Sequence, residues 1–408
     1  MKNALLASLA VLAVSTPPAA IAQSVFDLPI GDPARRESTL TPALDVIVAT
    51  ADGAELTPAQ IAERLEGVRL LLIGESHTSM DFHRVQERVV RALQDSGRRV
   101  LIGLEMFPVT EQASLDRWND GSWDEDEFVM NSEWYRHWGY NWLYYRDIFR
   151  TARAGNSPMY AVNAPRANVS AVRRKGFDGL TEEERTGIPP HVDTDSADHF
   201  TLFKAYFDDE EEDESTHTAG MTDEQWQAMF AAQCTWDGAM AWNAVHNLEA
   251  DPDPNSIMVV MVGSGHVAYG LGIARQAAAY FDGDAATLIP VPMEDEDGEP
   301  IATVRGSYAD FIWGVPGEIA PLYPSLGASL TETAEGLTVL FADPESLAGE
   351  AGITSGDRIL TFDGWEVGDR LTFKRLMADL RWGDTARLTI GRGQETFEIA
   401  IPLRRQYE

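Results

Sequence analysis

The chain has 408 residues, of which 44% are hydrophobic and 24% are charged, an ordinary composition for a folded protein of two domains. Its 32 Lys and Arg residues against 65 Asp and Glu residues give a formal net charge of −33, which argues against binding to nucleic acid or to an anionic membrane surface. The single cysteine, Cys234, excludes an internal disulfide framework and any zinc or iron–sulfur site of the CxxC type.

Residues 1–22 have the order of a secretory signal peptide. A short, weakly basic start is followed by the apolar run 4–14, a proline pair, and small residues at Ala20 and Ala22. The apolar run is shorter than the roughly 20 residues that a membrane-spanning helix needs. We therefore expect cleavage after Ala22 and an exported, soluble, periplasmic protein with no integral membrane segment.

Apolar runs of strand length alternate with helical segments over residues 35–295. The runs at 68–73, 100–104, 159–162 and 257–262 have the continuous apolar character of strands that are buried on both faces. Helices are expected to begin near Asp81, to cover 110–118, and to lie around 272–280. This alternation predicts an α/β domain with a mainly parallel sheet flanked by helices. The acidic segment 207–215 is interpreted as a solvated loop.

Polar residues directly follow several of the predicted strands. Glu75 and His77 belong to a G-E-S-H motif after the first strand, Glu105 follows the second, and His266 ends a G-S-G-H motif after the last. Because the carboxyl ends of parallel strands open on one edge of a sheet, where ligands bind, we expect these side chains to share a pocket. Histidines that only hold the two loops together by hydrogen bonds are the alternative interpretation.

Two chemistries fit such a pocket. Glu75, His77, Glu105 and His266 are candidate ligands of a divalent metal, because imidazole and carboxylate suit zinc, manganese or iron. Without a metal, the same side chains are candidate catalytic groups, with a carboxylate-assisted histidine as the general base that activates water. His83 is interpreted as a surface histidine, with a supporting role behind the pocket as the alternative.

The segment from about residue 60 to 285 resembles the ChaN family. The resemblance rests on several motifs in order: G-E-S-H at 74–77, G-L-E-M-F at 103–107, N-A-P-R at 163–166, D-G-A-M-A at 237–241 and G-S-G-H at 263–266. It implies haem binding and a role in iron uptake. The related Tiki proteases, in the same superfamily as the erythromycin esterases, imply metal-dependent hydrolysis instead. Many ChaN proteins are lipoproteins, whereas this chain has no cysteine near the expected cleavage site.

A haem site would draw on the aromatic segment 134–145. Tyr140, Tyr144 and Tyr145 are candidate iron ligands, because tyrosinate as well as histidine can hold haem iron. A helix that closes the domain core is the other interpretation of this segment. Arg136, Arg146 and Arg166 are candidate partners for the haem propionates. In a hydrolase, Arg166 would instead stabilise an oxyanion, and a structural salt bridge is its alternative. The chain has no CxxCH motif for covalent haem attachment.

Residues 320–405 change in character to short strands and turns. The segments A-G-I at 351–353, G-D-R-I-L at 356–360 and D-G at 363–364 precede a predicted helix over 371–380 and strands over 386–390 and 397–402. This order resembles a PDZ domain of the bacterial protease-associated type. The resemblance implies binding of protein C-termini, with the terminal carboxylate held by the loop Ser325, Leu326, Gly327 and Ala328. A PDZ domain that only packs against the first domain is the alternative.

We therefore expect an exported, ChaN-like haem-binding protein that handles haem or iron and carries a peptide-binding PDZ domain. A Tiki-like metal-dependent hydrolase or peptidase is the first alternative, and a non-catalytic periplasmic adaptor acting through the PDZ domain is the second. Whether the protein is an enzyme stays open at this point. A homodimer that shares a haem site between its subunits agrees equally well with the sequence.

Overall fold

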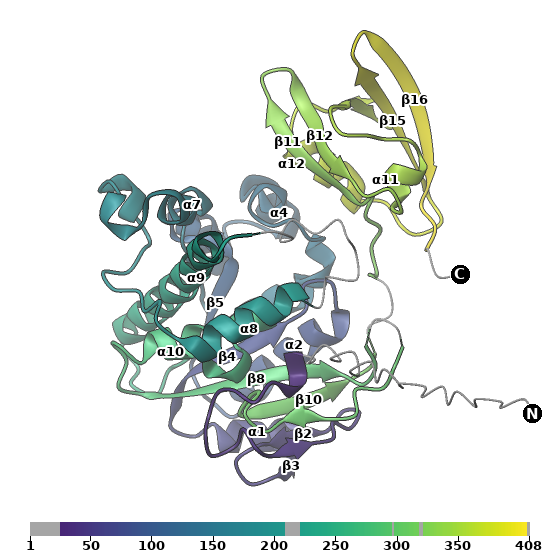
Figure 1. The fold of residues 1–408 in the computed structure, drawn as a ribbon. Coiled ribbons are helices and arrows are strands. Elements are labelled where there is room, and N and C mark those ends of the chain that lie inside the picture. The colour runs from purple at the N-terminus through teal and green to yellow at the C-terminus, as the bar shows by residue number, and fades with distance from the viewer. Residues whose placement is uncertain (1–24, 209–220, 296–297, 318–320, 406–408) are drawn as a thin grey trace, which may run out of the picture.

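The computed structural model describes residues 25–208, 221–295, 298–317 and 321–405, which form two domains (Figure 1). The expected signal peptide and most of the acidic segment 207–215 lie outside these ranges. Within them, no helix is both long enough and apolar enough to cross a bilayer.

The first domain is built on an eight-stranded sheet with the strand order β3-β2-β10-β8-β4-β7-β5-β6. The strands from β10 to β6 in this order are parallel, and β2 and β3 continue the sheet in antiparallel fashion. The strands are β2 (Ile47–Ala49), β3 (Ala54–Leu56), β4 (Val68–Glu75), β5 (Val100–Pro108), β6 (Met159–Asn163), β7 (Ile257–Gly263), β8 (Asp284–Pro292) and β10 (Phe311–Val315). The prediction of a mainly parallel sheet is confirmed.

Strand β10 lies beyond residue 295, where the sequence suggested that the domain ends. It pairs with β8 on one side and with β2 on the other, so the sheet needs this later segment to join its parallel part to the β2–β3 hairpin. A separate two-stranded sheet pairs β1 (Thr39–Leu40) with β9 (Val304–Arg305). The first domain therefore extends to about Val315.

Helices cover both faces of this sheet (Figure 1). The helix expected at 110–118 is α3, which follows a 3₁₀ turn over Val109–Glu111, and the segment around 272–280 contains the short helix α10. The helices are α1 (Pro58–Arg64), α2 (Met80–Asp95), α3 (Gln112–Asn119), α4 (Glu125–Asn131), α5 (Trp134–His137), α6 (Arg146–Ala154), α7 (Arg166–Lys175), α8 (Ala197–Asp208), α9 (Asp223–Ala250) and α10 (Ile273–Ala277).

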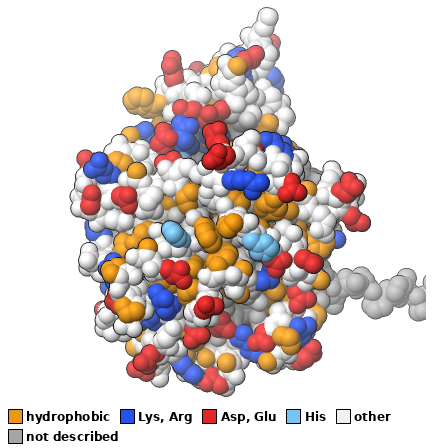
Figure 2. Space-filling view, turned by 90° about the vertical axis from the view of Figure 1, so that its left-hand side faces the viewer, with side chains coloured by type: hydrophobic (Ala, Val, Ile, Leu, Met, Phe, Trp, Pro, Cys, Tyr) orange, Lys and Arg blue, Asp and Glu red, His pale blue; other side chains and the backbone are white. Residues whose placement is uncertain are grey.

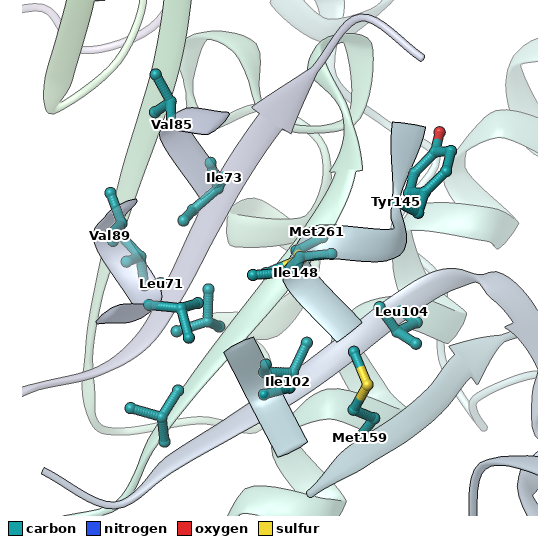
Figure 3. Packing of buried hydrophobic residues seen from close by; sticks show 14 of the residues in the cluster. Leu71, Ile73, Val85, Val89, Ile102, Leu104, Tyr145, Ile148, Met159 and Met261 are labelled. Atoms are coloured by element: carbon teal, nitrogen blue, oxygen red, sulfur yellow. The ribbon is translucent and has the colours of Figure 1, made fainter. Parts of the chain in front are cut away.

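Each face of the sheet has its own core, because successive residues of a strand point to opposite sides. Leu71 and Ile73 of β4 belong to the cluster that also contains α2 and α6, part of which is shown in Figure 3. Leu70 and Leu72 belong to the cluster on the other face, with α9 and α10. Tyr145 lies at the edge of the first cluster, and its hydroxyl group is directed away from the apolar side chains (Figure 3).

The second domain is a separate antiparallel structure with its own core. Its strands run in the order β11-β12-β13-β15-β16, with β14 paired to β13, so β11 is an edge strand. The elements are β11 (Ala328–Thr333), β12 (Gly336–Ala342), α11 (Leu347–Glu350), β13 (Arg358–Phe362), β14 (Trp365–Glu366), α12 (Arg370–Ala378), β15 (Thr385–Arg392) and β16 (Glu395–Pro402). The helix and strands expected from the sequence in this region are present, with ends that differ by a few residues.

Candidate functional site

The sheet register brings the two histidine loops together. Strand β7 lies between β4 and β5, and Glu75 at the end of β4 pairs in register with Gly263 at the end of β7. Leu104 of β5 pairs with Met261 of β7, which places Glu105 beside the same end of β7. The backbone N–H of Gly263 donates a hydrogen bond of 2.9 Å to the Glu105 carboxylate. The loops after β4 and β7 therefore leave from one edge of the sheet.

His77 is held by the carboxylate two residues before it. Glu75 is buried, and its Oε1 lies 2.9 Å from Nδ1 of His77. A neutral His77 therefore carries its proton on Nδ1, which leaves the lone pair on Nε2. The side chain of His77 is 27% exposed, and Nε2 has no hydrogen-bond partner among the described residues. Such carboxylate–histidine pairs orient metal-binding imidazoles in many proteins.

Glu75 stays ionised although it is buried. Burial by itself raises the pKa of a carboxyl group, but the nearby His83, the hydrogen bond from His77 and the hydrogen bond from Gln86 lower the pKa of Glu75 to about 2. The amide Nε2 of Gln86 donates to Glu75 at 2.6 Å, and the hydroxyl of Tyr145 donates at 2.8 Å. Glu75 is thus the centre of a buried hydrogen-bond network.

The expectation that His83 is a surface residue is wrong. His83 is buried, its Nδ1 lies 3.1 Å from the Gln86 side-chain oxygen, and its Nε2 lies 3.3 Å from the His77 carbonyl oxygen. The sequence places His83 on a helix, but it does not show which side of that helix faces the end of β4. The alternative interpretation, a supporting role behind the pocket, matches this position.

His266 is held differently, by a residue from helix α9. Its Nδ1 lies 2.5 Å from the buried carboxylate of Asp237, and its Nε2 lies 3.5 Å from Glu105. Burial lowers the pKa of His266, but the charge and hydrogen bond of Asp237, together with the charge of Glu105, outweigh burial and raise the pKa to about 8. His266 is therefore a cation at neutral pH, with an acid at each ring nitrogen.

Asp237 is the site residue that sequence reasoning did not identify. The D-G-A-M-A motif contains it, but nothing in the sequence shows that this position on α9 reaches the loop after β7. Its second oxygen lies 3.6 Å from Nε2 of buried His199. Burial, above all, lowers the pKa of His199 to about 4, so His199 is neutral and His266 carries the positive charge next to Asp237.

His77 and His266 face the same glycine. A Cβ atom on Gly263 would lie 3.2 Å from Cε1 of His77 and 3.8 Å from Cδ2 of His266. The absence of a side chain at this position therefore leaves room for both imidazoles. Burial lowers the pKa of His77, and the positive charge of His266 lowers it further, but Glu75 and Glu105 outweigh both and raise it.

The four predicted metal ligands lie near one another without forming a metal centre. Among the described residues, no group of three or more His, Cys, Asp and Glu side chains is arranged to hold a metal ion. The contacts give the physical reason. Glu75 accepts hydrogen bonds at both of its oxygens, and both ring nitrogens of His266 face carboxylates. The metal-ligand prediction gains no support from this geometry.

The three candidate tyrosines have different environments. Tyr145 is fully buried and donates to Glu75, and the hydroxyl of Tyr144 accepts a hydrogen bond from the backbone N–H of Tyr323. Tyr140 is only half-buried, and its hydroxyl has no hydrogen-bond partner among the described residues. Its ring centroid lies 4.7 Å from that of His77. Burial and the charges of Glu105 and Glu75 raise the pKa of Tyr140, so it is protonated unless a metal binds it.

Most of the aromatic segment closes the core, as one of its two interpretations proposed. Trp134, Trp142 and Tyr145 are buried and pack on one another, with Trp134 and Trp142 4.9 Å apart between ring centroids. Trp138 and Tyr140 instead pack on His77, at centroid distances of 4.9 Å and 4.7 Å. These two side chains, from the middle of the segment, form an aromatic wall beside the His77 ring.

Arg166 stands at the start of α7 and is exposed. Within the described parts of the chain it forms no ion pair, whereas Arg136 pairs with Glu133 and Arg146 with Asp147. Its positive charge partly offsets the rise in the pKa of Tyr140. The alternative interpretation of Arg166, a structural salt bridge, is thus not found among these residues.

The surface is not uniformly acidic despite the net charge. Figure 2 shows, on the side of α7 and α9, apolar side chains gathered near the middle of the face, with histidines on either side of them. Acidic and basic side chains are interspersed around this area (Figure 2). The excess negative charge is therefore not spread evenly over this face of the molecule.

Ser325, Leu326 and Ala328 of the PDZ-like loop Ser325–Ala328 line a cavity of about 620 Å³. The carbonyl oxygens of Leu326 and Gly327 accept hydrogen bonds from the backbone N–H groups of Ala348 and Asp343, so the path of the loop is fixed. Gly327 has φ +68°, and a Cβ there would lie 2.2 Å from Ser346 Cβ, so the turn requires glycine. Strand β11 and helix α12 form the sides of this cavity.

Comparisons with known proteins identify a family for each of the two domains. The family described as "Haem-binding uptake, Tiki superfamily, ChaN" matches residues 61–276, more than half of the chain, and the PDZ domain family matches residues 324–403. A solved structure entitled "Cofacial heme binding to ChaN of Campylobacter jejuni" aligns with a TM-score of 0.51 and 16% identity. It covers 65% of this chain and 95% of that protein, and at this identity it shows the fold.

A curated plant protein also matches. "Protein RETICULATA-RELATED 5, chloroplastic" from Arabidopsis thaliana is 26% identical over 151 residues, which amount to 35% of this chain and 20% of that protein. The match thus spans about a fifth of the length of this relative.

Proposed function

The chain belongs to the ChaN family of the Tiki superfamily and carries a C-terminal PDZ domain, and from this membership we propose that it binds haem beside His77 and Tyr140. One observation carries the proposal. The rings of His77 and Tyr140 pack on each other with 4.7 Å between their centroids, and neither Nε2 of His77 nor the hydroxyl of Tyr140 has a hydrogen-bond partner among the described residues. Both groups are known types of haem-iron ligand.

The residues around this pair also suit haem. Trp138 and Tyr140 provide aromatic faces against which a flat porphyrin can pack. Arg166 is a cation without an ion pair in the described chain, which suits a propionate carboxylate. Glu75 holds the His77 ring in the orientation that presents Nε2. Bound haem would supply an iron centre. These residues would bind the haem, orient it and balance the charge of its propionates, which agrees with a role in haem uptake or handling.

A haem titration of three tyrosine variants tests this proposal. We expect a Soret band at stoichiometric haem for the wild-type protein, and a shifted band with weaker binding for Tyr140→Phe. Tyr144→Phe is the matched control, because its hydroxyl serves Tyr323, and it should bind as the wild type does. Tyr145→Phe should weaken haem binding only indirectly, because it removes the hydrogen bond that the Tyr145 hydroxyl donates to Glu75. Equal spectra and affinities for Tyr140→Phe and the wild type would refute the role of Tyr140.

We propose a second binding function for the PDZ domain, the recognition of protein C-termini. The open edge of β11 and the fixed loop Ser325–Ala328 favour it, since a peptide can add a strand to such an edge while loop N–H groups bind its carboxylate. A labelled peptide that binds as a free acid, and at least 10-fold more weakly as a C-terminal amide, would support this function. Equal binding of the two forms would contradict it.

We also propose that the protein is exported after removal of residues 1–22. The support is the order of charge, apolar run and small residues in the sequence. Protein sequencing of the mature chain should find Gln23 at its N-terminus, and retention of Met1 would contradict this proposal.

A further inference from the structure

The cavity beside the PDZ loop belongs to both domains. Strand β11 contributes Ala328, Ser329 and Leu330, and helix α12 contributes Arg370, Phe373, Lys374 and Met377. The first domain contributes Thr78, Tyr135, Gly139, Tyr140, Asn141 and Tyr144. The groove between β11 and α12, where a PDZ domain takes its peptide, is thus bounded by a wall from the haem-binding domain.

Direct contacts hold this wall in place. The side-chain amide of Asn141 donates to the carbonyl oxygen of Ala378 at the end of α12, at 3.0 Å. Lys374 Nζ lies 3.4 Å from the carbonyl oxygen of Gly139. Tyr323, which precedes the PDZ loop, packs edge-on against Tyr144 with 4.9 Å between ring centroids. The segment 139–144 therefore lies against α12 and the PDZ loop.

Positive charge is concentrated at one end of the cavity. Arg370 and Lys374 lie one helical turn apart on α12, and both line the cavity. Burial, Arg370 and Arg166 together lower the pKa of Lys374 to about 8. Neither Arg166 nor Arg370 has an ion pair among the described residues. In a chain of net charge −33, such a cluster is a local site for an anion.

The position of this cluster along the groove can be read from β11. The backbone N–H of Arg370 donates to the Glu332 carboxylate at 3.1 Å, so the start of α12 is level with Glu332. A strand rises about 3.3 Å per residue. A peptide paired with β11, with its carboxylate at Gly327, would therefore bring the residues about two to four positions before its C-terminus to Lys374 and Arg370. The Glu332 carboxylate already accepts the first N–H of the helix.

We propose that this cavity is a composite site for a protein C-terminus with an apolar last residue and an acidic residue two to four positions before it. The apolar residue enters the groove between Leu326, Phe373 and Met377, and the acidic side chain pairs with Lys374 and Arg370. Tyr140 and Tyr144 of the first domain cover the peptide from outside. Because Tyr140 also packs on His77, the peptide lies next to the proposed haem site. This inference rests on the peptide-binding function proposed above.

Fluorescence anisotropy with matched peptides tests the charge preference on the whole two-domain protein. The probes are a labelled peptide ending Gly-Ser-Glu-Glu-Ala-Val, the same peptide with two lysines in place of the glutamates, and the C-terminal amide of the first. The glutamate peptide should bind at least 10-fold more tightly than the lysine peptide. Lys374→Met should reduce this ratio several-fold. Arg375→Met, an exposed cation on the same helix that does not line the cavity, should leave it unchanged.

Cross-linking tests the wall from the first domain. The glutamate peptide with benzoylphenylalanine in place of its alanine should, after irradiation, become attached to residues 139–144 as well as to the PDZ domain. If the amide form fails to bind while the glutamate and lysine peptides bind equally, and cross-links are confined to 324–403, the PDZ domain binds C-termini and the composite site is refuted. If the amide binds as well as the free acid, or if no peptide binds, the peptide-binding function fails and the inference fails with it.

Discussion

The loops after β4 and β7 carry the same G-x-x-H pattern but use their histidines in different ways. His77 is oriented by Glu75 from its own strand, and its Nε2 faces an aromatic wall. His266 is held by Asp237 from α9 and by Glu105 from β5, so both of its ring nitrogens face acids. One loop thus offers a donor atom to a ligand, whereas the other contributes a fixed positive charge. A repeated motif need not mean a repeated role.

The largest expected effect comes from removing the acid behind His77. Glu75→Ala leaves the donors of His77, Gln86 and Tyr145 unpaired in a buried place. We expect it to lower the free energy of unfolding by about 3–5 kcal/mol, measured by urea denaturation. Glu63→Ala, at an exposed position, should change it by less than about 0.5 kcal/mol. Similar values for the two variants would show that the Glu75 network contributes little.

Haem affinity should separate the two histidines next. His77→Ala removes a proposed iron ligand and should weaken haem binding by about 100-fold. Both ring nitrogens of His266 face carboxylates, so this residue has no free nitrogen with which to bind iron. His266→Ala removes only a positive charge near the site, and it should weaken haem binding by less than about 10-fold. His246→Ala, exposed on α9, is the control and should bind haem as the wild type does. A larger loss for His266→Ala than for His77→Ala would reverse the comparison.

The pH dependence of stability should report the charge on His266. Its pKa is about 8 in the folded protein and 6.5 in an unfolded chain, so protonated His266 stabilises the fold. This contribution, about 2 kcal/mol, is fully present below pH 6.5 and is lost as the pH rises through about 8. Asp237→Asn removes the acid that raises the pKa.

Urea denaturation of the wild type and Asp237→Asn at pH 6 and pH 9 measures this effect. The difference in unfolding free energy between the two proteins should be larger at pH 6 by about 2 kcal/mol. Because His77 titrates in both proteins, its contribution largely cancels in this difference. An equal difference at both pH values would show that His266 does not carry the charge.

The smallest expected effect concerns Arg166. This side chain is exposed, so its attraction for a propionate is screened by water, and Arg166→Met should weaken haem binding by only about 2- to 5-fold. Added salt should reduce the difference between this variant and the wild type. Arg174→Met, exposed at the other end of α7, should have no effect. A loss as large as that of His77→Ala would show that water does not screen the attraction of Arg166 for the propionate.

Local patterns determined much of the fold and of the site. The apolar runs that became β4, β5, β6 and β7 were recognisable because strands buried on both faces are continuously apolar. The convergence of Glu75, His77, Glu105 and His266 followed from a general property of parallel sheets. By contrast, β10 was missed, because a five-residue strand at 311–315 becomes recognisable as part of this sheet only by its pairing with β8 and β2.

The sequence by itself determined the order of the domains, the strands and the residues that stand at the sheet edge, because these depend on neighbours along the chain. Only the tertiary structure decided what surrounds each of them. Asp237 reaches His266 from 29 residues away, His83 turns inward to Glu75, and Lys374 meets Gly139 across 235 residues. These contacts set the charge, the burial and the free donor atoms of the site. They depend on how helices pack over the sheet, and side-chain packing over such separations leaves no periodic signal in the sequence.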